Sequence, residues 1–277
     1  MEAIGSYWIG LASYLHAQGF TVAVVNPAQA HDFAQALLRR NKTDALDAQM
    51  LAQLAQMLKP APWQLPPQVY QELNQRLGQR QALQNIRQQL RNQLHALLAS
   101  TKAMDAVVVR QEQLITAFDQ QIKELEKEIE RVADSDVDWA KTIHLLVSVP
   151  GIGLLSASII ASLTLCFASC PTAQTACSYA GLVPQEHQSG TSVHGRARIG
   201  HSGNGQLRRT FYLCALPAIR FNPVMHTFYE RLRSEGNPAK VALCAVARKL
   251  CVLCWWIVHR QQPFDLAYAQ GKVELVS

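Results

Sequence analysis

The clearest candidate for covalent chemistry is a serine in a stretch rich in glycine and basic residues. In the run Tyr179–Arg209, Ser189 is followed by glycine and lies among arginines. A serine on such a loop can present its hydroxyl with little steric hindrance, and nearby arginines can favour its deprotonated form and stabilise charge during transesterification at phosphorus. Ser192 and Ser202 compete for this role. The alternative is a flexible anion-binding loop that has no nucleophile.

Acidic residues near the start of the chain form a second candidate site. Asp44 and Asp47 are three residues apart, so they share one face of a predicted helix. Two such carboxylates can share a divalent cation, and phosphoryl-transfer sites often use two of these ions. Glu2 is a possible third ligand. In the simpler interpretation, Asp44 caps the helix and Asp47 faces solvent.

A third candidate is a glycine-rich turn inside His144–Leu163. An apolar helix is predicted to run into Pro150, Gly151 and Gly153, and a second helix with small residues follows. This order is typical of a helix-hairpin-helix, in which backbone N–H groups at a helix N-terminus bind a nucleic-acid phosphate without reading its sequence. An ordinary tight turn between two helices is the alternative.

Charge is distributed unevenly along the 277 residues, whose formal net charge is +6. Residues 112–138 hold nine acids and three bases, a net of −6. Residues 189–260 hold eleven bases and two acids, a net of +9. A local positive field attracts polyanions and speeds encounter with them, so the second region predicts either a nucleic-acid surface or a basic surface exposed only to solvent.

The seven cysteines predict a reducing environment. Their number is odd, their neighbours are apolar and no secretory signal is recognised, so we expect free thiols in the cytoplasm. Cys251 and Cys254 form a CxxC pattern inside a run, Val241–Val258, that is typical of a buried helix. No second pair completes a zinc site, so a core position is favoured. Lysine or arginine interrupts every long apolar stretch, and no membrane span is expected.

The elements that must position these residues differ along the chain. The first 58 residues suggest an α/β domain, because a short apolar strand at Phe20–Val25 lies between helical segments. Two long helices, Val69–Ala99 and Gln111–Val132, carry apolar residues at spacings of three and four, the pattern of a coiled coil or helical hairpin. The first is basic and the second acidic. They could pair with each other or with another subunit.

This organisation predicts four segments. They are an α/β domain at 1–59, a proline-rich linker at 60–68, coiled-coil helices at 69–138 and a mainly α-helical C-terminal domain at 139–277.

Taken together, these segments resemble one family. The run from Glu2 to Ala52 is similar to the RuvC-like (RNase H-like) half of the DEDD-type transposases of bacterial insertion sequences, the one-ten family that includes the pilin-gene invertase Piv. The runs SVPGIGLLSASIIASL, YAGLVPQEHQSG and GNGQLRRTFYLCALPA resemble that family's second transposase domain. The resemblance covers nearly the whole chain, in the right order.

The resemblance implies DNA transposition or site-specific recombination. A magnesium-binding acidic site, here Glu2, Asp44 and Asp47, would act with a nucleophilic serine, here Ser189. Family members are guided by a structured RNA and work as oligomers, which implies DNA, guide RNA and a dimer or tetramer as partners. The residues expected to bind nucleic acid are Pro150, Gly151, Gly153, Arg196, Arg198, Asn204, Arg208 and Arg209.

One departure from the family pattern concerns the acidic site. The family's first Asp lies on a strand ahead of the Glu, and this sequence starts only one residue before Glu2. We therefore expect an incomplete RuvC-like site and a chain that is N-terminally truncated. A misassigned start codon or a truncated element copy would explain the truncation. Two alternatives follow. One is a catalytically dead remnant that still binds nucleic acid. The other is a RuvC-like nuclease for branched DNA, which needs the carboxylates but not Ser189.

Overall fold

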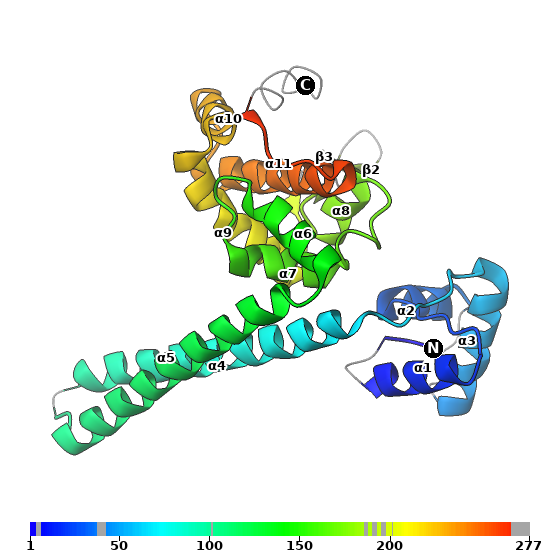
Figure 1. Ribbon diagram of the computed structural model, residues 1–277, viewed down its shortest axis with the longest axis horizontal. Helices are drawn as coiled ribbons and strands as arrows, with labels where there is room; N and C mark the ends of the chain where they lie inside the picture. Colours follow the sequence, from blue (N-terminus) through cyan, green and yellow to red (C-terminus); the bar gives the residue numbers. More distant parts are fainter. Residues whose placement is uncertain are drawn as a thin grey trace. The chain divides into compact units, whose positions relative to one another are not determined.

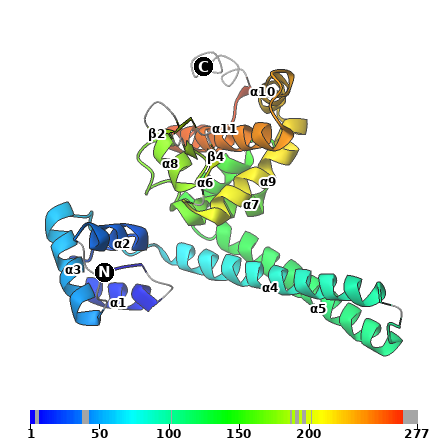
Figure 2. The ribbon, with the colours of Figure 1, turned by 180° about the vertical axis from the view of Figure 1, so that it is seen from behind.

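The computed structural model describes residues 1–3, 7–37, 43–100, 102–185, 188–189, 193–194, 198–200 and 202–266. This part of the chain is mostly helical (Figure 1, and from behind in Figure 2). It divides into two compact units, Met1–Pro67 and Gln68–Ser277, and the division falls at the end of the proline-rich segment.

Three helices build the first unit: α1 (Tyr7–Ala17), α2 (Pro27–Ala36) and α3 (Asp44–Leu58). Local sequence explains where two of them begin. Asn26 caps α2 ahead of Pro27, and the Thr43 side chain accepts a hydrogen bond from the Leu46 N–H at the start of α3. A small core joins α2 and α3 and consists of Val25, Ala30, Met50 and Leu54.

The predicted strand Phe20–Val25 is much reduced in the structure. This segment meets residues 1–3 through one parallel bridge, between Glu2 and Val25, and the Ala3 N–H donates to the Val25 carbonyl at 3.1 Å. The parallel direction fits the expectation, but two such short segments cannot form a sheet that helices would cover. The described part of this unit is therefore helical, and the expected α/β architecture is not developed in it.

The second unit begins with two long helices, α4 (Gln68–Leu98) and α5 (Asp105–Ala133), which pack against each other. Helix α5 begins six residues before the predicted start. Its buried face carries the predicted spacing of three and four, with Ile122, Leu125, Ile129 and Val132 all buried. On α4 the buried residues lie in the first three turns, at Val69, Leu73 and Leu77.

Ion pairs connect the basic helix to the acidic one. Arg76 pairs with Glu128 at 3.2 Å and Arg80 with Glu126 at 2.6 Å, and further along both Arg87 and Arg91 reach Asp119. The residue numbers of the arginines increase along this series while those of their acidic partners decrease, so α4 and α5 are antiparallel. The two helices thus pair within one chain, which is one of the two arrangements that the sequence left open.

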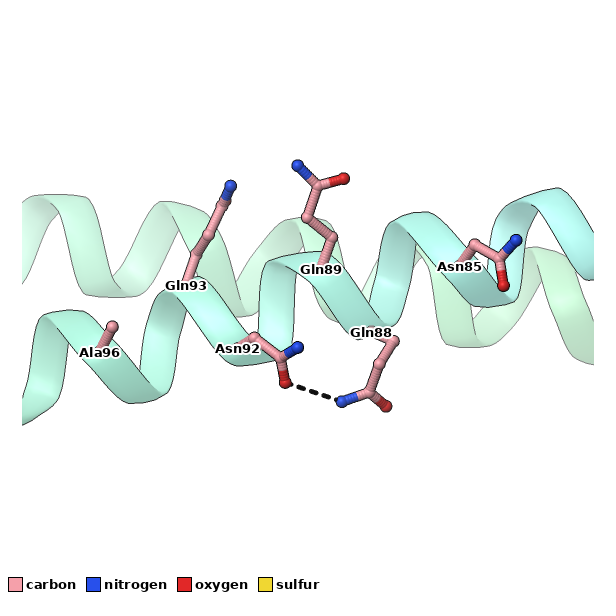
Figure 3. A pocket seen from close by; sticks show the side chains of 6 residues that line it. All are labelled: Asn85, Gln88, Gln89, Asn92, Gln93 and Ala96. Carbon is pink, nitrogen blue, oxygen red and sulfur yellow. Dashed lines mark hydrogen bonds between the residues drawn. The ribbon is translucent and has the colours of Figure 1, made fainter.

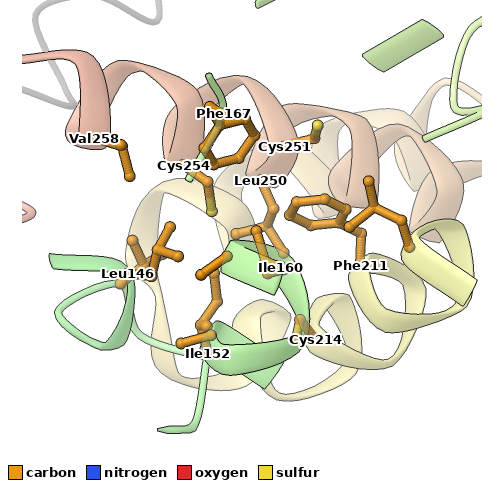
Figure 4. Packing of buried hydrophobic residues seen from close by; sticks show 14 of the residues in the cluster. Leu146, Ile152, Ile160, Phe167, Phe211, Cys214, Leu250, Cys251, Cys254 and Val258 are labelled. Carbon is orange, nitrogen blue, oxygen red and sulfur yellow. The ribbon is translucent and has the colours of Figure 1, made fainter. Parts of the chain in front are cut away.

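The rest of the second unit is a helical bundle: α6 (Val137–Val147), α7 (Leu154–Thr164), α8 (Ala173–Tyr179), α9 (Gly205–Phe221), α10 (Pro223–Ser234) and α11 (Ala239–Arg260). Helix α11 lies against α6, α8, α9 and α10. Cys251 and Cys254 point into its buried side, where they pack among Ile160, Phe167 and Leu250 (Figure 4). The expected core position of the CxxC pattern agrees with this packing.

Helix α11 is also long and apolar enough to cross a membrane, with a mean hydropathy of 2.0 over its most apolar stretch. Of that stretch, 56% is buried inside the structure. The buried Trp255 Nε1–H donates to the Cys170 carbonyl at 2.8 Å, which ties this helix to the turn before α8. Packing in the bundle core accounts for its apolar composition.

The α4–α5 ion pairs predict a pH-dependent contribution to stability. The Arg87 hydrogen bond and the charges of both arginines hold the pKa of Asp119 below its ordinary value of 3.8. Its charged form therefore stabilises the folded state above that pH, and this contribution is lost as the pH falls through the lowered pKa. We expect Asp119→Asn to lower the free energy of unfolding by about 1 kcal/mol at pH 7, measured by urea denaturation.

The matched control is Glu112→Gln, which removes an exposed acid from the same helix and is expected to change stability little. The difference between wild type and Asp119→Asn should shrink as the pH falls through the lowered pKa of Asp119. Equal losses from both substitutions, or a difference that does not change with pH, would contradict this interpretation.

Candidate functional site

Ser189 lies on a small β-hairpin between α8 and α9. Strand β1 (Pro184–Gln185) pairs antiparallel with β4 (Arg198–Ile199), and β2 (Gln188–Ser189) pairs antiparallel with β3 (Val193–His194). In the inner ladder the backbone of Ser189 is opposite Val193, so the serine occupies the pair nearest the tip. The sequence indicated only a glycine-rich insert, and the hairpin was not predicted. Ser192 and Arg196 lie outside the described residues.

Two glycines close the base of this hairpin. Gly181 and Gly203 both have positive φ, +66° and +83°. A Cβ atom on Gly203 would lie 2.6 Å from the backbone nitrogen of Gly181, and one on Gly181 would lie 2.4 Å from the Ser202 carbonyl oxygen. Neither position has room for a side chain. The sequence motifs YAG and GNG are therefore the two sides of one backbone contact.

Polar groups of the GNG motif fix this base to α9. The Asn204 N–H donates to the Tyr179 carbonyl at 2.7 Å, and the Asn204 side chain caps α9 by accepting from the Leu207 N–H at 3.0 Å. The Arg208 guanidinium donates from Nη1 to the carbonyls of Ser202, Gly200 and Gly181, at 3.0, 3.4 and 3.4 Å.

Two residues expected to bind nucleic acid thus have structural contacts in the hairpin base. The Asn204 side chain accepts a hydrogen bond from the α9 backbone, and one terminal nitrogen of Arg208 donates to loop carbonyls. Arg209 is the next residue on α9 and is exposed. In the sequence, Arg208 and Arg209 are neighbours with nothing to distinguish them. The helical repeat separates them by about 100°, which turns one toward the hairpin and the other toward solvent.

The Pro150–Gly153 turn connects α6 to α7 and packs on α9. Gly151 has a φ of +107°, and a Cβ atom there would lie 2.7 Å from the Cβ of Ala218. Close packing therefore explains this glycine without a ligand. Gly153 is the N-cap residue of α7, and no side chain caps the helix there. The first-turn N–H groups of α7 are the donors that a helix-hairpin-helix would offer to phosphate.

The three acidic candidates lie in the first unit. Asp44 and Asp47 occupy the first turn of α3, where Asp44 is exposed and Asp47 half-buried. Glu2 is half-buried in the segment bridged to Val25. Over the part of the chain that the structure describes, no three His, Cys, Asp or Glu side chains are close enough to hold a metal ion together. Mg²⁺ binds proteins through one or two carboxylates and completes its shell with water and substrate phosphate, so the two side chains of the α3 pair are of the chemical type that this ion requires.

A shallow groove on α4 lies apart from all of these residues. It is lined by Asn85, Gln88, Gln89, Asn92, Gln93 and Ala96, and Gln88 donates a hydrogen bond to Asn92 (Figure 3). Its lining carries no charge and no nucleophile. The groove is therefore not a candidate for the chemistry that the sequence suggests.

Comparisons with known proteins match both ends of the chain to transposases. A DEDD transposase model of the IS110 type matches residues 1–103, and a model described as transposase of the IS116/IS110/IS902 family matches residues 143–230. The pilin gene-inverting protein of Moraxella lacunata is 29% identical over 96% of this chain and 81% of its own length. A 43.6 kDa protein of insertion element IS110 from Streptomyces coelicolor is 32% identical over 55% of this chain and 36% of its own length.

These matches define a DNA-acting enzyme of bacterial insertion elements, as the resemblance implied. The chain belongs to the IS110 family of transposases. The second match, residues 143–230, spans the Pro150–Gly153 turn, the serine hairpin and α9. The acidic set after which the DEDD class is named points in general to divalent metal dependence.

The hairpin base predicts a large cost for adding one methyl group. We expect Gly203→Ala to lower the free energy of unfolding by about 1–3 kcal/mol, because alanine combines a positive φ with a clash against the Gly181 backbone. Gly78→Ala is the control, since Gly78 lies within α4 with open space around it. That substitution should stabilise the protein by about 0.5–1 kcal/mol. Chemical denaturation measures both, and a neutral Gly203→Ala would contradict the close approach.

Proposed function

We propose that this transposase cuts and joins DNA through attack of the Ser189 hydroxyl on a phosphodiester. The observation that carries the proposal is the position of Ser189 beside the tip of a hairpin whose base is closed by Gly181 and Gly203 and tied to α9. A nucleophile needs a defined position relative to the phosphorus atom it attacks, and a fixed base supplies this better than a free loop.

The proposed step exchanges one phosphate ester for another. A bond forms between Ser189 Oγ and phosphorus, and the bond from phosphorus to one deoxyribose oxygen breaks. The serine proton leaves to solvent or a base, and the departing sugar oxygen gains a proton. The phosphoserine ester preserves the energy of the phosphodiester, so the hydroxyl of another strand can reverse the step and complete the joining.

We assign the metal to the first turn of α3. Asp44 and Asp47 would hold Mg²⁺, and Glu2 joins this set on the family resemblance alone. When bound, the ion would neutralise charge on the phosphate. The relation of this unit to a RuvC-like, RNase H-like domain, the structured guide RNA and a dimer or tetramer of the chain are inferred from the same resemblance. A cytoplasmic location is inferred from the odd number of cysteines and their apolar neighbours, and the four-segment division from the order of the predicted elements and the proline-rich linker.

Arginines around the hairpin would hold the nucleic acid. Arg196, Arg198 and Arg209 are proposed phosphate contacts, while Asn204 and Arg208 act mainly by holding the hairpin base. The Pro150–Gly153 turn would offer backbone N–H groups to a second phosphate. Arginine suits this task because it stays charged and can donate two parallel hydrogen bonds.

The serine mechanism predicts a separation of binding from chemistry. We expect Ser189→Ala to abolish strand exchange on an element-end substrate while leaving DNA affinity within about twofold of wild type, because only the attacking oxygen is removed. Ser192→Ala and Ser202→Ala are the controls and should retain strand exchange. Full recombination by Ser189→Ala would exclude Ser189 as the nucleophile, and DNA cleavage without joining would favour a carboxylate-dependent nuclease.

The metal assignment predicts dependence on the α3 carboxylates. We expect Asp47→Asn and Asp44→Asn each to reduce Mg²⁺-dependent strand exchange at least about 100-fold, because a ligand to the ion is lost. Asp32→Asn, an exposed acid on α2, is the control and should retain activity. Strand exchange by the α3 variants at the wild-type rate would contradict the assignment.

A further inference from the structure

Helices α10 and α11 carry a cluster of cations that the sequence analysis did not single out. Between Gly205 and Arg260 the chain has nine bases and two acids, Glu230 and Glu235. Arg231 pairs with Glu235 along α10 at 3.8 Å. Lys249 of α11 forms neither an ion pair nor a hydrogen bond within the part of the chain that the structure describes.

One aromatic ring holds two of these cations close together. The Lys249 ammonium lies 4.3 Å from the centroid of the Phe228 ring, and the Arg231 guanidinium lies 5.4 Å from the same centroid. Phe228 packs against the buried core of the bundle, so its position is set by the fold. The two charges therefore come from different helices and meet at one fixed aromatic side chain.

This arrangement leaves excess positive charge. Burial lowers the pKa of Lys249, and the charge of Arg231 lowers it further. An aromatic face attracts a cation only weakly compared with a carboxylate, so Phe228 positions the two charges without neutralising them. An anion between Lys249 and Arg231 would remove their repulsion, and both side chains retain free N–H donors for it.

Helices α10 and α11 both pack against α9, the helix that follows the serine hairpin. On α11, burial raises the pKa of the Cys244 thiol, and the charge of Arg208 at the hairpin base lowers it. Lys249 follows Cys244 by five residues, roughly 7–8 Å along the helix axis. Between them, the Arg248 carbonyl contacts the Cys177 thiol of α8 at 3.8 Å.

We propose that Arg231 and Lys249, positioned by Phe228, form a phosphate-binding site that anchors the backbone of duplex DNA on the helical bundle that also carries the serine hairpin. The inference rests on the proposed function, because it supplies that function with a DNA contact outside the hairpin. The site combines a compact ammonium and a planar guanidinium and has no element that reads a base. It therefore contributes affinity without sequence preference.

The test measures binding of the full-length protein to a 30-base-pair duplex at several salt concentrations, by fluorescence anisotropy. We expect Lys249→Gln and Arg231→Gln each to weaken binding roughly five- to tenfold at about 0.1 M salt and to reduce the slope of log affinity against log salt by about 1. The same loss should appear on duplexes of unrelated sequence. Lys249→Arg should restore most of the affinity.

The matched control is Arg233→Gln. Arg233 lies on α10 with Arg231, but its guanidinium donates to the Asn237 carbonyl at 2.6 Å instead of joining Phe228. An equal loss in this control would overturn the proposal in favour of a general charge effect. Unchanged DNA affinity and salt slope in both cluster variants would also overturn the proposal. So would variants that lose binding to an acidic protein but keep wild-type affinity for DNA.

Phe228→Leu tests the positioning role of the ring. Leucine keeps an apolar side chain against the core but removes the aromatic face, so affinity should fall while circular dichroism and melting temperature stay near wild type. Wild-type affinity in Phe228→Leu would contradict that role. The phosphate-binding site and the serine mechanism are tested independently of each other. Ser189→Ala reports on strand exchange, and the Lys249 and Arg231 variants report on DNA binding.

Discussion

The C-terminal unit depends on close backbone approaches at three glycines. Gly181 and Gly203 meet at the base of the serine hairpin, and Gly151 brings the α6–α7 turn against Ala218 of α9. All three have positive φ, and a β-carbon at any of them would lie within 3 Å of another residue. Helix α9 receives both contacts, the hairpin at its start and the turn near its end. It thereby sets the relation between the two elements that the family resemblance connects with DNA.

The uneven charge along the sequence has a structural explanation in two parts. Three of the nine acids in residues 112–138, Asp119, Glu126 and Glu128, pair with arginines of α4, and these ion pairs fix the antiparallel arrangement of α4 and α5. Part of the negative charge is thus balanced between these two helices. In the basic region acids are few, since the span from α9 to α11 contains nine bases against two acids. A surplus of positive charge remains on the bundle that also carries the serine, as a protein acting on a polyanion requires.

Structure changes the meaning of several residues that composition had grouped together. The interleaved arginines, glycines and serines looked like one anion-binding loop. In the fold, Arg208 holds carbonyls, Asn204 caps a helix and Arg209 faces solvent. The cation cluster at Phe228 joins residues 228, 231 and 249, and no local pattern reveals that juxtaposition because two helices must first pack together. Among the acidic candidates, Asp44 and Asp47 are neighbours because both lie in the first turn of α3.

By itself, the sequence determined the elements governed by local rules. Apolar residues at spacings of three and four define the long helices, and four motifs in order carry the family resemblance. Tertiary structure alone decided that α4 pairs with α5, that Phe20–Val25 forms a single bridge within the described residues and that Ser189 lies on a hairpin. Helix signals are local because each hydrogen bond spans four residues. Strand pairing and charge pairing depend on partners distant in the chain, which are fixed only when the chain packs.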